Sequence, residues 1–185
     1  MVSTNDLRTG MVLELDGDLW TVLFFQHHKP GKGQAVVRTK LRNVRSGAVL
    51  ERTFRADEKV DQAILDKREM QYLYHDGTHW IFMDNASYEQ LSVEEGEIGD
   101  VTNWLKEGQT AYLALYEGRP VSVELPAAVD LVITKTEPGI KGDRVSGATK
   151  LATLETGITI QVPLFVEQGE IVRVDTRTGE YLTRA

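Results

Sequence analysis

The sequence of 185 residues contains no cysteine. This absence excludes a disulfide framework, thiolate chemistry and a cysteine-based zinc site, and it fits a reducing compartment. No apolar run approaches the ~18 residues of a membrane span, and the first ten residues lack the apolar core of a signal peptide. We therefore expect a cytoplasmic protein without a membrane partner. With 41% hydrophobic and 26% charged residues, the composition is that of an ordinary globular protein.

Acidic side chains are missing between Asp18 and Glu51, although the whole chain has a net charge of −7. The same stretch carries six cations and two histidines: Lys29, Lys32, Arg38, Lys40, Arg42, Arg45, His27 and His28. Residues 65–126 show the opposite balance, with 12 acidic and 4 basic side chains. This segregation predicts one face that meets a polyanion and another that does not; a solvated basic hairpin is the alternative interpretation.

Short β-type segments follow one another along almost the whole chain and predict an all-β fold. The clearest is a hairpin over residues 71–83 around the turn Asp76-Gly77. Pro163 predicts an edge position or a bulge for its strand. Short helices are expected at 57–64 and 98–105, where apolar residues have helical spacing.

The chain divides into three predicted units, residues 1–64, 65–126 and 127–185. The second and third each contain roughly five short strands in about 60 residues, which is typical of small Greek-key barrels of the OB type. Units of this size are marginally stable alone, so we expect neighbouring barrels to pack against one another.

The segment Lys29-Pro30-Gly31-Lys32-Gly33-Gln34 lies between two predicted strands, which places Lys32 at or near a hairpin tip. Pro30 restrains the backbone before the turn, and Gly31 and Gly33 supply conformational freedom on either side. A lysine between glycines has no bulky neighbours, so it can enter a narrow site. A plain surface turn is the alternative interpretation.

The strand after this loop carries a row of cations. Alternation places Arg38, Lys40 and Arg42 on one face at ~6.6 Å intervals. Such a row suits the phosphate backbone of RNA better than it suits base recognition, and a strand face kept soluble by charge is the alternative.

Motifs for enzymatic chemistry are absent from the sequence. There is no Gly-x-Ser-x-Gly, P-loop or dinucleotide fingerprint, and no catalytic residues are predicted. His75 and His79 bracket a turn and lack the helical spacing of a metal site, so neither a metal nor a cofactor is expected. The paired carboxylates Glu94 and Glu95 are interpreted as part of a solvated loop.

Nine short motifs are distributed over the whole chain, at residues 29–35, 40–43, 51–54, 71–74, 82–84, 88–90, 152–157, 161–166 and 175–181. Together they resemble the bacterial elongation factor P family. The resemblance implies three small β-barrel domains, an N-terminal KOW/SH3-like barrel followed by two OB-folds, in an L-shaped arrangement that mimics tRNA. Members of that family bind the ribosome between the P and E sites beside peptidyl-tRNA and relieve stalling at consecutive prolines.

The resemblance also implies roles for individual residues. Lys32 would point toward the CCA end of the peptidyl-tRNA, and it is a candidate for post-translational extension by a lysine-modifying enzyme. Lys29, Arg38, Lys40 and Arg42 would contact tRNA or rRNA phosphates near the acceptor stem. The residues expected on the codon or small-subunit side are Gly142, Asp143, Arg144, Tyr181 and Arg184. Arg144 replaces the threonine of the family's Gly-Asp-Thr loop, which puts that contact in question.

The expected partners are therefore the 70S ribosome and peptidyl-tRNA, and the protein is expected to be a monomer. From charge alone, the acidic segment 65–126 would avoid rRNA or face basic ribosomal proteins. A paralogue of elongation factor P with other client sequences is one rival interpretation. A generic OB-fold RNA-binding protein is another, in which Tyr72, Tyr74, Trp80 and Phe82 would stack on bases; the acidity of their segment argues against it.

Overall fold

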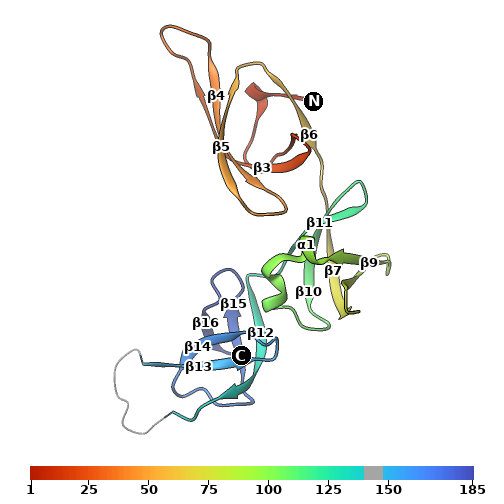
Figure 1. The fold of residues 1–185 in the computed structure, drawn as a ribbon, viewed down its shortest axis with the longest axis vertical. Helices are drawn as coiled ribbons and strands as arrows, with labels where there is room; N and C mark the ends of the chain where they lie inside the picture. The colour runs from red at the N-terminus through yellow and green to blue at the C-terminus, as the bar shows by residue number, and fades with distance from the viewer. Residues whose placement is uncertain (140–147) are drawn as a thin grey trace. The chain divides into compact units, whose positions relative to one another are not determined.

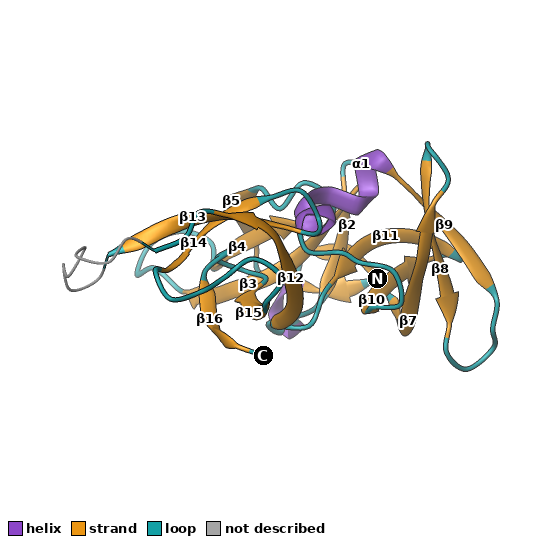
Figure 2. Ribbon diagram, turned by 90° about the horizontal axis from the view of Figure 1, so that it is seen from below, coloured by secondary structure: helices purple, strands orange, loops and turns teal. Residues whose placement is uncertain are grey.

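The computed structural model describes residues 1–139 and 148–185 and contains strands throughout, with helix only in short segments (Figure 2). The all-β prediction is confirmed. Contacts group the chain into two compact units, residues 1–68 with 114–122 and residues 69–113 with 123–185.

The first sheet has the strand order β1-β6-β2-β3-β4-β5. Its strands are β1 (Val2–Ser3), β2 (Val12–Leu15), β3 (Asp18–His28), β4 (Val36–Asn43), β5 (Val49–Arg55) and β6 (Lys59–Ala63), and the short 3-10 helix η1 (Thr4–Asp6) follows β1. Its core is formed by Leu7, Leu13, Leu15, Val22, Val37, Leu41, Phe54 and Val60. Figure 1 shows the β3–β4 hairpin extending past the neighbouring strands into a loop.

The prediction of a short helix at residues 57–64 is wrong. Residues 59–63 form β6, which pairs with β1 at Val2–Val60 and with β2 at Val12–Ala63. Val60 and Ala63 are buried in the sheet, whereas Ile64 is 83% exposed and does not complete an apolar stripe. Pairing with two distant strands therefore overrides the local helical spacing.

The second sheet has the order β11-β10-β7-β8-β9. Its strands are β7 (Asp66–His75), β8 (His79–Asp84), β9 (Gln90–Glu94), β10 (Thr110–Tyr116) and β11 (Arg119–Glu124). The predicted hairpin is confirmed, because β7 and β8 pair in antiparallel register around Asp76-Gly77. The helix expected at residues 98–105 is present only in part, as α1 (Glu95–Ile98) and the 3-10 helix η2 (Gly99–Asn103).

The third sheet has the order β14-β13-β12-β15-β16. Its strands are β12 (Ala128–Thr136), β13 (Thr149–Leu154), β14 (Thr159–Pro163), β15 (Ile171–Asp175) and β16 (Tyr181–Arg184). β14 is an edge strand, as Pro163 predicts, because proline cannot donate a hydrogen bond to a second neighbour. The proposed domain limits near residues 64 and 126 stay a prediction.

Candidate functional site

The candidate tip lies in the loop between β3 and β4. The ladder between these strands ends at the pair His28–Val36, and residues 29–35 form the loop beyond it. Lys32 is exposed near the middle of this loop, in agreement with its predicted position at or near a hairpin tip. Gly33 has φ +108°, a conformation that side chains with a Cβ rarely adopt. A residue other than glycine at position 33 would therefore distort the backbone that presents Lys32.

The rest of the loop leaves the lysine accessible. Pro30 is half-buried, whereas Lys29 and Gly31 are exposed. Among the described residues, no atom lies within 4 Å of a Cβ added to Gly31, so the space beside this glycine is open. The loop can therefore project one cation from a hairpin end, and the functional role of that cation stays a prediction.

The strand β4 separates an inner apolar row from an outer basic row. Val37, Thr39 and Leu41 are buried, and the Thr39 hydroxyl donates to the Arg52 carbonyl oxygen at 2.7 Å. The alternating residues Arg38, Lys40 and Arg42 are all exposed. Packing of the inner row against the core thus holds the three cations on one outer face, at the interval of two residues that the alternation predicts.

The neighbouring strands leave this basic row available. In the ladders on either side, Arg38 lies between Gln26 and Thr53, and Lys40 lies between Phe24 and Glu51. Within residues 1–139 and 148–185, none of the three cations forms an ion pair. Free cations on a sheet can neutralise phosphates, and displaced counterions would then make the affinity sensitive to salt.

Phe24 is a further candidate on this face, and the sequence alone does not indicate it. This ring is 54% exposed and lies directly opposite Lys40 in the register of β3 and β4. A register shift between Val22 and Phe24 interrupts the regular alternation, which is why pattern reasoning could not assign its face. An aromatic ring beside cations is typical of surfaces that meet unpaired bases, so Phe24 extends the candidate interface.

The C-terminal candidates are engaged with their own chain. Tyr181 is half-buried and packs against the core of the third sheet. Arg184 donates from Nη2 to the Phe165 carbonyl oxygen at 3.0 Å and stacks over the Phe165 ring at 4.4 Å. Its Nε also lies 3.2 Å from Oε2 of Glu170, an ion pair rather than an aligned hydrogen bond. An RNA contact by Arg184 would compete with these interactions, and its role stays a prediction.

The remaining candidates are Gly142, Asp143 and Arg144, which lie outside the described residues. Among the described residues, no group of three or more His, Cys, Asp or Glu side chains could hold a metal ion. His75 instead stacks on Trp80, with ring centroids 4.2 Å apart. In the same part of the chain, no helix is long and apolar enough to cross a bilayer.

Three family models match consecutive parts of the chain. They are an elongation factor P KOW-like domain over residues 3–60, an elongation factor P OB domain over residues 65–123 and an elongation factor P C-terminal domain over residues 129–184. The first two matches agree with the predicted fold class, a KOW-like barrel followed by an OB-fold.

Proteins named elongation factor P are similar to this chain over its full length. Elongation factor P of Moorella thermoacetica is 56% identical over 185 residues, covering 100% of both chains. That of Acidothermus cellulolyticus is 59% identical, covering 100% of this chain and 99% of the other. Among solved structures, the eukaryotic translation initiation factor 5A from Methanococcus jannaschii is 25% identical with a TM-score of 0.54, over 66% of this chain and 92% of that one. The chain therefore belongs to the elongation factor P family of translation elongation factors.

Proposed function

We propose that this chain binds the 70S ribosome between the P and E sites, beside peptidyl-tRNA, and stimulates peptide-bond formation at consecutive prolines. The observation that carries the proposal is the arrangement of a single hairpin. Exposed Lys32 lies at its end between two glycines, and the exposed cations Arg38, Lys40 and Arg42 follow on its outer face. One element thus combines a slender cationic tip with a surface suited to phosphates.

Catalysis in this proposal comes from positioning. Proline is a poor and constrained nucleophile, so the reacting groups are badly aligned when prolines follow one another. The basic row binds phosphates of the acceptor stem, together with Lys29, and Lys32 steadies the CCA end. Holding the reactants in place lowers the entropic part of the barrier, with no acid or base supplied by the factor.

The oligomeric state, the location and the modification of the protein are also part of what we propose. It acts as a monomer in the cytoplasm, and a lysine-modifying enzyme that extends the Lys32 side chain is a further partner. Extension would lengthen the reach of the tip without changing the loop. Intact-mass measurement of the natively expressed protein tests this part, because an unmodified mass would exclude the extension.

Substitution of the tip lysine tests the proposed function. Lys32→Ala is expected to reduce translation of a Pro-Pro-Pro reporter to the level without the factor, while the melting temperature stays unchanged because the side chain is exposed. Lys59→Ala, which removes an exposed lysine from β6, is the matched control and should retain rescue. Full rescue by Lys32→Ala would overturn the tip assignment. If the parent chain relieved only other stalling sequences, the paralogue would be favoured.

A further inference from the structure

Tyr88 lies at the tip of the β8–β9 hairpin, where its backbone and its side chain are both unusual. Its φ is +61°, in the left-handed region, and the residue as a whole is 72% exposed. Glycine and asparagine are the residues that such turn positions favour, and a bulky side chain there is an outlier. The local turn chemistry therefore does not account for a tyrosine at this position.

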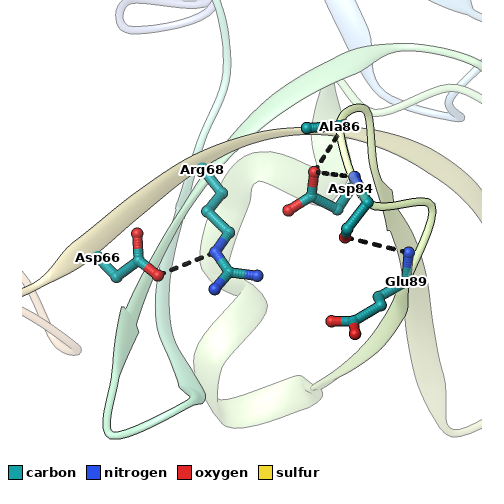
Figure 3. Close-up of polar contacts among 6 residues, drawn as sticks. Asp66, Arg68, Asp84, Ala86 and Glu89 are labelled. Carbon is teal, nitrogen blue, oxygen red and sulfur yellow. Dashed lines mark hydrogen bonds and ion pairs between the residues drawn. The ribbon is translucent and has the colours of Figure 1, made fainter.

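The hairpin loop holds this conformation firmly. Asp84 is only 6% exposed, and its carboxylate accepts hydrogen bonds from the backbone N–H of Ala86 at 2.7 Å and of Ser87 at 3.2 Å (Figure 3). The Tyr88 N–H donates to the Asp84 carbonyl oxygen at 2.9 Å, and the Asp84 N–H donates to that of Glu89 at 2.8 Å. The Ser87 hydroxyl accepts from the Glu89 N–H at 3.3 Å. The loop therefore presents the ring from a fixed backbone.

Burial within the chain does not offset the backbone cost of this tyrosine, because most of its side chain remains in solvent. A rigidly presented tyrosine is, however, well suited to an interface. It offers a large contact area with few rotatable bonds, and tyrosine is enriched among the residues that dominate binding energy. The ring is thus placed to be buried by a partner.

The acidic character of the segment that carries this hairpin indicates the chemistry of that partner. Residues 65–126 carry 12 acidic and 4 basic side chains. Glu89, next to Tyr88 in the chain, and Glu69 are both exposed. Glu69 lies close to the loop, because the Asn85 N–H donates to the Glu69 carbonyl oxygen at 3.4 Å. Carboxylates repel phosphates and attract cationic surfaces. We propose that Tyr88 anchors a positively charged surface of a ribosomal protein, with the ring in an apolar pocket and the carboxylates at its rim.

This inference rests on the proposed binding to the ribosome, and substitution of Tyr88 tests it. Asparagine tolerates the left-handed region, so Tyr88→Asn should keep the loop and should leave the melting temperature unchanged or a few degrees higher. Its affinity for purified 70S ribosomes carrying peptidyl-tRNA should fall about tenfold, measured by anisotropy of the labelled full chain. Tyr112→Asn, which removes a 44% exposed tyrosine from β10, is the matched control and should change affinity less than about twofold.

The two proposals fail in different ways. If the parent chain does not bind ribosomes, the proposed function fails. If the parent binds and Tyr88→Asn binds equally well, the anchor alone is overturned. A benzophenone side chain in place of the Tyr88 ring identifies the partner by photo-cross-linking on the ribosome. A cross-link to a basic segment of a ribosomal protein is expected, whereas cross-links to rRNA, tRNA or a second copy of the chain would overturn the assignment.

Discussion

At the scale of single residues, two aspartates stabilise hairpin turns through their carboxylates. Asp76 accepts hydrogen bonds from the His79 N–H at 2.7 Å and from the Thr78 N–H at 2.9 Å. Asp175 accepts in the same way from the N–H groups two and three residues further along, at 2.7 and 3.1 Å. These backbone hydrogen bonds favour the ionised form, so the pKa of each carboxyl lies below the usual range of an aspartate.

The lowered pKa values predict a loss of stability in acid. Because the folded pKa of Asp76 and of Asp175 is below the unfolded value of about 4, both carboxylates contribute stability above that pH. The contribution is lost as the pH falls through the folded pKa. Carboxyl NMR titration of the folded chain should therefore give lower midpoints for both residues than titration in denaturant. Equal or higher midpoints would contradict the prediction, and Asp76→Asn should make the free energy of unfolding less dependent on pH between about 5 and 3.

At the scale of elements, side-chain alternation gives β4 one buried row and one exposed row. Val37 and Leu41 of its inner row belong to the core of the first sheet, and its outer row carries Arg38, Lys40 and Arg42. The cations can therefore be removed without opening a cavity. This separation makes the outer face testable independently of folding.

Replacing Arg38, Lys40 and Arg42 together by alanine should weaken ribosome binding and reduce its salt dependence. If each cation neutralises one phosphate, the slope of log affinity against log salt should become shallower by about 2 to 3. A control variant with Lys59, Lys67 and Lys135 replaced by alanine removes the same charge from exposed positions on other strands. An unchanged slope in the β4 variant, or an equal change in the control, would argue against phosphate contacts by this face.

At the scale of the whole molecule, Trp104 joins two stretches that are distant in sequence. It directly follows η2, yet it is 8% exposed and belongs to the core of the third sheet. The Thr156 hydroxyl donates to the Asn103 carbonyl oxygen at 2.6 Å. A Cβ on Gly179 would lie only 3.2 Å from the indole ring, so this glycine makes room for it. These contacts lie within the compact unit formed by residues 69–113 and 123–185.

Removing the indole should loosen this unit. Trp104→Ala is expected to lower the free energy of unfolding by about 3–5 kcal/mol, because a large buried ring is lost from a packed core. Limited proteolysis should then cut near Pro126 faster, and hydrogen exchange should increase in β12 and β15. Trp104→Phe, which keeps a ring in the cavity, should give a smaller effect. Unaltered proteolysis of Trp104→Ala would show that the indole does not hold the two stretches together.

Local patterns predicted much of this arrangement. The alternation along β4, the turn at Asp76-Gly77 and the edge position of Pro163 depend on backbone geometry within a few residues, and all three are found. The loop around Lys32 was predicted for the same reason. The helix expected at residues 57–64 was wrong, because the partners of β6 are strands near the start of the chain.

By itself, the sequence determined the all-β class, the basic hairpin with its lysine tip and the acidic middle segment, since residue type, spacing and charge depend on neighbours along the chain. Only the tertiary structure decided that Trp104 is buried in the third sheet, that Arg184 is held by Glu170 and Phe165, and that Tyr88 is displayed in a left-handed turn. These features depend on which distant groups meet when the strands pair and the cores close. The spacing of residues along the sequence does not show which distant groups come into contact.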